Sequence, residues 1–256
     1  MKRFPFIILL MFFFYSCEKE ANITLEEMPP TPVVEAQIST MHKDSYIKIT
    51  MSKGFEQDSY EYEYITNAQI KVQDENGNII PFYLNNEGFF ITDEDALPET
   101  EYFLDIQFDN YHITGEEPVL SIPFLRGGAV RENKIDVDIQ DPSPETDYYI
   151  IEIYTFDNND YTGGYRFLVN DNERKHGTFI FENIYVNPED SMEYVIKHIP
   201  ENYYNYLMVL ADIGEAGYGQ SPFNTTVMGN PVSNLSTGIG FFGSTAVHRV
   251  VYQHTN

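Results

Sequence analysis

A chain of 256 residues with 40 acidic and 15 basic side chains carries a formal net charge of −25 at pH 7. A surface this acidic repels phosphate backbones, which excludes nucleic acid as a partner. Hydrophobic residues make up 42% of the chain and include 20 Tyr and 19 Phe, which predicts a packed core and excludes a disordered polyanion.

The first residues have the order of an export signal. Lys2 and Arg3 form a basic start, and an apolar stretch interrupted only by Pro5 runs from Phe4 to Tyr15. About a dozen helical residues span roughly 18 Å, which is well short of the 30 Å hydrocarbon core of a membrane. We therefore expect residues 1–16 to be a cleaved signal peptide and not a transmembrane helix.

The single cysteine, Cys17, follows this stretch directly. It has no disulfide partner within the chain, and its place at the end of the apolar run is typical of a site of diacylglycerol attachment. Fatty acyl chains such as palmitate at Cys17 would hold the mature protein on a membrane without a spanning segment. The alternative is an ordinary signal peptide followed by an incidental cysteine, since Phe14–Ser16 is bulkier than the usual lipobox.

A charged and then proline-rich segment separates Cys17 from the expected folded part. It ends in Met28–Pro32, where three of five residues are proline, and prolines at this density favour an extended chain. We interpret residues 17–32 as a lipidated cysteine followed by a tether that holds the folded part away from the lipid.

Residues 33–125 show the period of two that half-buried strands produce. Ile47 and Ile49 alternate with polar residues, and Asn76–Gly77 offers the positive φ angles of a tight hairpin. About seven short strands with turns between them predict an immunoglobulin-like or transthyretin-like sandwich. The expected strands cover residues 46–51, 68–73, 79–84, 89–92, 102–108, 112–115 and 119–124.

The pattern breaks around Leu125–Gly128, and we expect a second β-rich domain over residues 126–256. Alternation returns after the break, with Ile135 and Val137 facing one way and Asp136 the other. The strands expected in this domain cover residues 135–139, 148–156 and 245–253.

One apolar stripe has helical spacing, which predicts a covering helix near residues 200–213. The predicted fold class is therefore mainly β, with a sandwich followed by a β-rich domain and one helix. The stripe consists of Tyr203, Tyr206, Leu207, Leu210 and Ile213.

The sequence lacks the usual motifs of enzyme chemistry. None of the six histidines has zincin spacing, no nucleophile elbow occurs, and Gly163–Gly164 and Gly238–Gly243 lack the context of phosphate-binding loops. We therefore expect a non-enzymatic protein with no catalytic residue, no cofactor and no metal. Two loops, Asp74–Asn78 and Asp157–Asp160, offer oxygen ligands as calcium sites do, but ordinary turn chemistry explains both.

Tyrosines on loops are the candidates for a contact surface. A rigid amphipathic ring buries area at low entropy cost, and loops carry function on β scaffolds. The alternative is that most of these rings fill the cores. The candidate surface consists of Tyr60, Tyr62 and Tyr64, and of the glycine- and asparagine-rich segment Gly214–Ser236 with Tyr218 and Phe223.

A combination of motifs is shared with a known family. The motifs are Cys17–Glu20, Val33–Ala36, Ile65–Val72, Asp74–Gly77, Asp141–Tyr149, Tyr203–Ala211, Ser221–Phe223, Asn230–Asn234 and Gly238–Gly243. Together they resemble a Bacteroidetes outer-membrane lipoprotein family of unknown function, domain-of-unknown-function family 4249, over nearly the whole mature chain. The resemblance implies an outer-membrane lipoprotein associated with a TonB-dependent receptor as its surface-exposed partner, and it carries over no catalytic residue.

The leading hypothesis is a non-enzymatic surface lipoprotein that assists an outer-membrane receptor, by binding a nutrient or by covering the receptor's extracellular mouth. The lipid anchor, the tether and the β modules motivate it. The alternative is a structural or adhesive envelope protein that acts through strand addition or docking of β faces. A glycan-active enzyme would need two carboxylates across a cleft, which the sequence does not suggest.

Overall fold

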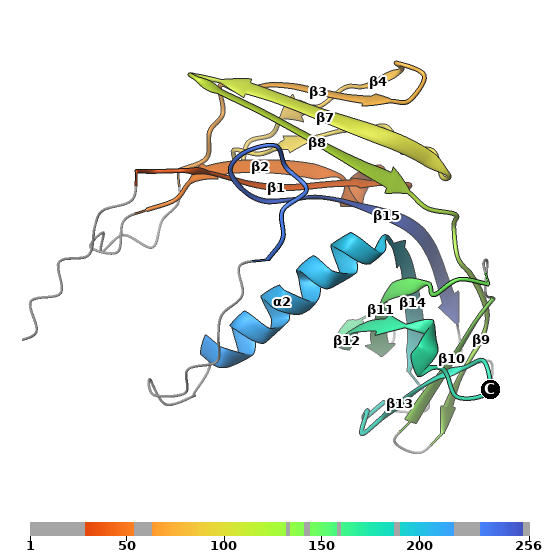
Figure 1. Ribbon diagram of the computed structural model, residues 1–256. Coiled ribbons are helices and arrows are strands. Elements are labelled where there is room, and N and C mark those ends of the chain that lie inside the picture. Colours follow the sequence, from red (N-terminus) through yellow and green to blue (C-terminus); the bar gives the residue numbers. More distant parts are fainter. Residues whose placement is uncertain are drawn as a thin grey trace, which may run out of the picture.

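The computed structural model consists mainly of β-strands arranged in an upper and a lower unit (Figure 1). One α-helix, α2, occurs among the residues described. This confirms the predicted fold class, a mainly β protein with a sandwich and one helix. The described residues are 29–53, 63–131, 134–140, 144–157, 160–186, 190–217 and 231–252.

The upper unit is a sandwich of two sheets (Figure 1). One sheet contains β1 (Pro32–Ser39), β2 (Tyr46–Met51), β5 (Tyr83–Leu84), β6 (Phe90–Ile91) and the first half of β15 (Ile239–Tyr252). The other has the order β4-β3-β7-β8 and contains β3 (Gln69–Asp74), β4 (Ile79–Ile80), β7 (Thr100–Phe108) and β8 (Tyr111–Val119). Alternate side chains, such as Ile49 and Leu104, are buried in the core between the sheets.

The lower unit packs a second pair of sheets around its own core. One sheet contains β11 (Tyr148–Asp157), β12 (Asp160–Asn170), β14 (Ser191–Ile199) and the second half of β15. The other contains β9 (Phe124–Arg131), β10 (Lys134–Gln140) and β13 (Phe179–Glu182). Ile135 and Val137 of β10 are fully buried against Ile151 and Ile153 of β11, as their period of two predicts.

Strand β15 connects the two units. Residues 239–245 pair in parallel with β1, and residues 246–252 pair antiparallel with β14. The predicted closing strand began at residue 245, so the first half was missed. Gly240 explains the error, because at its φ of +115° a Cβ atom would lie 1.8 Å from the carbonyl oxygen of Val34. A position that only glycine can occupy made the strand resemble a loop.

The sequence predicted that the strand pattern breaks around Leu125–Gly128, but the structure has strand β9 there. β8 ends at Val119 and β9 begins at Phe124, so the strand expected at residues 119–124 is wrong. β9 continues through Gly127 and Gly128, where the pattern had indicated an interruption, and its pairing with β10 shifts register between Leu125 and Gly127. Gly128 is needed there because a Cβ atom would lie 2.8 Å from the ring of Tyr194. No strand was predicted at the positions of β1, β12, β13 and β14.

Helix α2 (Glu201–Gly217) confirms the predicted covering helix and lies on the sheet that β15 and β11 share (Figure 1). Tyr203 and Tyr204 are buried, and the ring of Tyr203 stacks on Phe241 at 5.4 Å. Within the described part of the chain, no helix is long and apolar enough to cross a membrane.

The close approach of α2 to β15 depends on Gly243. A Cβ atom at this position would lie 2.5 Å from Cζ of Tyr203. We expect Gly243→Ala to lower the free energy of unfolding by about 1–3 kcal/mol, because the buried ring has to move. A denaturant titration measures the change, with Gly127→Ala as control because nothing lies within 4 Å of a Cβ atom there. Equal stability of the two variants would contradict this packing.

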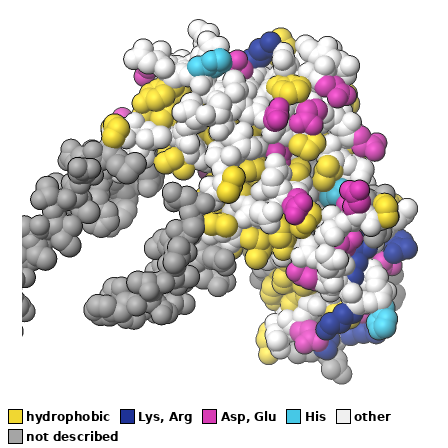
Figure 2. Space-filling view, viewed as in Figure 1, with side chains coloured by type: hydrophobic (Ala, Val, Ile, Leu, Met, Phe, Trp, Pro, Cys, Tyr) yellow, Lys and Arg dark blue, Asp and Glu magenta, His cyan; other side chains and the backbone are white. Residues whose placement is uncertain are grey.

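Charge is distributed unevenly over the surface. Figure 2 shows Lys and Arg side chains gathered over the lower unit, whereas acidic side chains dominate the upper unit on the same face. Several of the basic groups are in ion pairs, including Arg126 with Asp138, and Lys134 with Glu182. The face of the upper unit shown in Figure 2 is therefore predominantly acidic.

Candidate functional site

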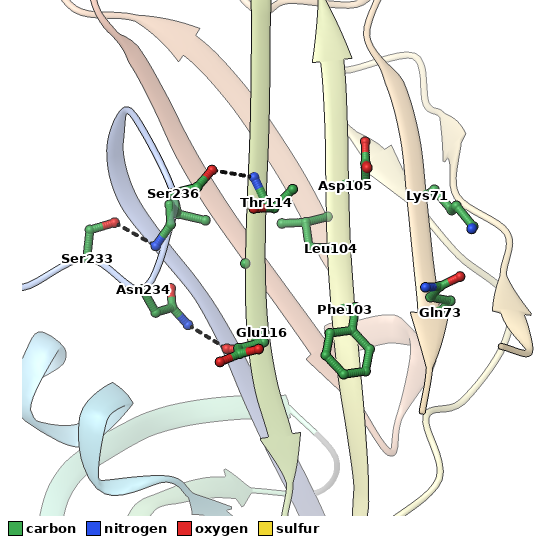
Figure 3. A pocket seen from close by; sticks show the side chains of 12 residues that line it. Lys71, Gln73, Phe103, Leu104, Asp105, Thr114, Glu116, Ser233, Asn234 and Ser236 are labelled. Carbon is green, nitrogen blue, oxygen red and sulfur yellow. Dashed lines mark hydrogen bonds between the residues drawn. The ribbon is translucent and has the colours of Figure 1, made fainter. Parts of the chain in front are cut away.

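A cleft of about 530 Å³ lies on the outer face of the β3-β7-β8 sheet (Figure 3). Its floor is the sheet, and its wall is the segment Ser233–Ser236, which precedes β15. The lining residues are Lys71, Gln73, Phe103, Leu104, Asp105, Thr114, Gly115, Glu116, Ser233, Asn234, Leu235 and Ser236.

The strand register places the side chains of the floor in rows. Gln73 pairs with Phe103, and Phe103 pairs with Glu116, so an aromatic ring has an amide on one side and a carboxylate on the other. Figure 3 shows the Phe103 ring between these two side chains. The next row places Asp105 between Lys71 and Thr114. The floor is thus a polar face with one aromatic ring in it.

The wall covers the free edge of β8. The amide N–H of Ser236 donates to the carbonyl of Thr114 at 2.8 Å, and the amide of Thr114 donates to the hydroxyl of Ser236 at 2.9 Å. Leu235 forms an isolated bridge with Gly115. Edge strands expose unpaired backbone groups, and here the segment satisfies them.

Asn234 fixes the wall to the sheet behind it. Its side-chain N–H groups donate to Glu117 Oε2 at 2.9 Å and to the Phe242 carbonyl at 2.8 Å, and its side-chain oxygen accepts from the amide of Phe242 at 2.9 Å. Because these groups are used within the protein, Asn234 positions the wall and does not serve a ligand.

Glu117 is the buried anchor of this arrangement. Its side chain is fully buried, and Oε2 also accepts from Asn202 at the start of α2 at 2.8 Å. Burial raises the pKa of the Glu117 carboxyl to about 8, against the opposing effect of the Asn202 and Asn234 amides. Its other oxygen, Oε1, has no hydrogen-bond partner in the described structure. The wall, β8 and α2 therefore meet at a buried carboxyl group whose pKa is raised well above its ordinary value.

The structure places few of the predicted contact residues. Tyr64 pairs with Thr50, contacts the Phe89 ring at 6.1 Å and lies outside the cleft. Of the predicted segment Gly214–Ser236, the described end contributes the wall. The predicted site residues Cys17, Tyr60, Tyr62, Tyr218 and Phe223 lie outside the described residues.

The cleft residues Gln73, Phe103 and Glu116 were not predicted as site residues. One signal for them exists in β7. Its alternate residues Leu104 and Ile106 face the core, which places Phe103 on the outer face, where a polar residue is the norm. An aromatic ring on the solvent side of a strand is a sign of a contact surface.

The loop Asp74–Asn78 behaves as a turn, as its composition indicated. Asp74 Oδ1 accepts from the amides of Asn76 and Asn78, and Oδ2 accepts from the Asn78 side chain at 2.7 Å. The hydrogen bond from the Asn78 side chain is the main cause that lowers the pKa of Asp74. Of the second predicted loop, residues 158–159 lie outside the described part, and the described residues contain no group of three or more metal-ligating side chains.

Comparisons with solved structures find matches of low similarity only. The chicken interferon gamma receptor alpha chain has 9% identity and a TM-score of 0.23, over 66% of this chain and 89% of that one. A segment of two fibronectin type III domains from chicken tenascin has 14% identity and a TM-score of 0.23, over 68% and 88%. A cytokine receptor complex has 10% identity and a TM-score of 0.25, over 86% and 94%.

Sequence comparison is more specific. No curated protein matches the chain. The model of one family, described as a domain of unknown function (DUF4249), matches residues 18–250, which is nearly the whole chain after Cys17. The chain belongs to the DUF4249 family.

Proposed function

We propose that this protein is a non-enzymatic, lipid-anchored binding protein of the outer membrane that assists a TonB-dependent receptor. The observation that carries the proposal is the cleft on the β3-β7-β8 sheet, whose wall is held in place by the Glu117 carboxyl and Asn234. Amides, hydroxyls and one aromatic ring are groups that bind a ligand through hydrogen bonds and packing.

The placement of the cleft supports an anchored role. The expected tether continues into β1, which belongs to the sheet opposite the one that carries the cleft. The 14 residues between Cys17 and the start of β1 at Pro32 reach at most about 50 Å. A protein held in this way keeps its cleft free while it stays near a receptor in the same membrane.

If Cys17 carries the lipid anchor, Cys17→Ser changes the location of the protein in the cell envelope. Without the thiol no acyl chain is attached, so we expect the variant to move from the membrane fraction to the soluble fraction of the cell envelope. Fractionation followed by immunoblotting measures this, with Ser16→Ala as a control that keeps the thiol. Retention of Cys17→Ser in the membrane fraction would contradict the anchor.

The receptor association is tested by deleting the gene. We expect uptake through its TonB-dependent receptor to fall, and uptake to return on complementation with the native protein. Unchanged uptake in the deletion strain would refute the accessory role.

One observation favours the alternative, a structural or adhesive envelope protein. β12 is an edge strand of 11 residues and has β11 as its neighbour on one side, with no strand on the other among the described residues. Tyr161 on this strand and the nearby Tyr185 are 63% and 85% exposed. A long open edge with exposed rings suits strand addition. A gene position within a fimbrial or secretion cluster would favour this function.

A further inference from the structure

The aromatic ring of the cleft and its two polar neighbours form a recognition platform. Side chains directly opposite in an antiparallel pair have Cβ atoms about 4.5–5.5 Å apart, so Gln73 and Glu116 flank Phe103 at one strand spacing on either side. The Phe103 ring offers a flat apolar surface, and the amide and the carboxylate at its sides offer both donors and acceptors.

We propose that the cleft binds a neutral saccharide, with a sugar ring on the face of Phe103 and its hydroxyls hydrogen-bonded to Gln73 and Glu116. A sugar ring presents C–H groups on its faces and hydroxyls around its rim, which matches a ring between two hydrogen-bonding groups. The inference rests on the proposed binding function and gives it a class of ligand.

The charge of the cleft disfavours an anionic ligand. Lys71 is the one Lys or Arg side chain among the lining residues, and it stands next to Asp105 in the register, with Glu116 also in the lining. Together with the acidic surface of the upper unit, this repels phosphates and carboxylates. A neutral ligand rich in hydroxyls meets no such repulsion.

The backbone arrangement disfavours a peptide that adds as a strand. The edge of β8, where such a peptide would pair, is already occupied by Leu235 and Ser236. What is left for a ligand is the side-chain surface of the sheet. A volume of about 530 Å³ falls within the range of small-molecule sites and is large enough for a short oligosaccharide.

Calorimetric titration of the full mature chain with gluco-, xylo-, manno- and chito-hexasaccharides tests the proposal. We expect at least one of them to bind, and Phe103→Ala to weaken that binding by about tenfold or more. Phe103→Tyr keeps the flat ring and is expected to retain most of the affinity, which separates recognition from misfolding. The matched control is Tyr185→Ala, which removes an exposed aromatic ring that is not part of the lining and should leave affinity unchanged.

Two results would overturn the proposal. One is that the native protein binds none of the four hexasaccharides, and the other is that Phe103→Ala binds as tightly as the native protein. If the native protein binds none of them while the deletion strain still shows reduced receptor uptake, the saccharide class is wrong and the accessory function stands. If Phe103→Ala binds as tightly as the native protein, the saccharide does not lie on the Phe103 ring, and the proposed site is wrong. If the native protein binds no hexasaccharide and uptake in the deletion strain is also unchanged, the accessory function is wrong as well.

Discussion

Replacing Glu117 with glutamine is expected to stabilise the protein by about 2–4 kcal/mol at pH 8 and to have little effect near pH 4. The native carboxyl is fully buried, and its folded-state pKa is raised from 4.5 to about 8. Between pH 4.5 and about 8 folding therefore takes up a proton at Glu117, so the contribution of this group to the free energy of unfolding is largest below pH 4.5 and falls as the pH rises to about 8. Glutamine does not titrate, and its oxygen can accept from Asn202 and Asn234 as Oε2 does.

Denaturant titrations of both proteins at several values between pH 4 and pH 8 measure this difference. Glu116→Gln is the matched control. The Glu116 side chain is exposed, so this variant makes the same chemical change at the surface. We expect the control to follow the native protein at every pH. Parallel curves for Glu117→Gln and the native protein would show that Glu117 is not buried as described.

Replacing Asp147 with alanine is expected to destabilise the protein by about 3 kcal/mol. His198 is buried at 4% exposure, with Nδ1 2.9 Å from the carbonyl oxygen of Ser121 and Nε2 3.2 Å from Oδ1 of Asp147. Each ring nitrogen thus faces an acceptor, and loss of the carboxylate leaves one nitrogen buried without its partner. Ser121 lies in the segment between β8 and β9 that connects the two units. The contact with His198 therefore holds this segment against β14.

The milder variant Asp147→Asn is the control for this contact. Its side-chain amide can donate to Nε2 of a neutral His198 ring, so we expect a loss of about 1 kcal/mol. Urea unfolding of both variants and of the native protein measures the effect. An alanine variant that unfolds at the same urea concentration as the native protein would refute the contact's role.

Much of the fold could be predicted because its strands are locally regular. Ile47 and Ile49, and Ile135 and Val137, alternate with polar residues and end up in the two cores. The spacing of Tyr203 and Leu207 likewise predicted α2. β15 was only half predicted, because its first half depends on pairing with β1 some 200 residues earlier, and such pairing leaves no local pattern.

The cleft could not be predicted, because it depends on long-range register. The side chain of Asn234 reaches the β8 carbonyl of Glu116 across 118 residues of sequence. Glu117 itself was accessible to sequence reasoning, since it falls on the same face of β8 as Ile113 and Val119. In a chain with 40 acidic residues, however, a carboxylate in a strand pattern passes easily for surface charge.

The association with a receptor is tested most directly by purifying the tagged protein from its native outer membrane in mild detergent and identifying by mass spectrometry what accompanies it. We predict that a TonB-dependent receptor is recovered in stoichiometric amount, and that an acylated Cys17 is found at the mature N-terminus. Recovery of the lipoprotein alone, under conditions that preserve other receptor complexes of the same membrane, would contradict the accessory function.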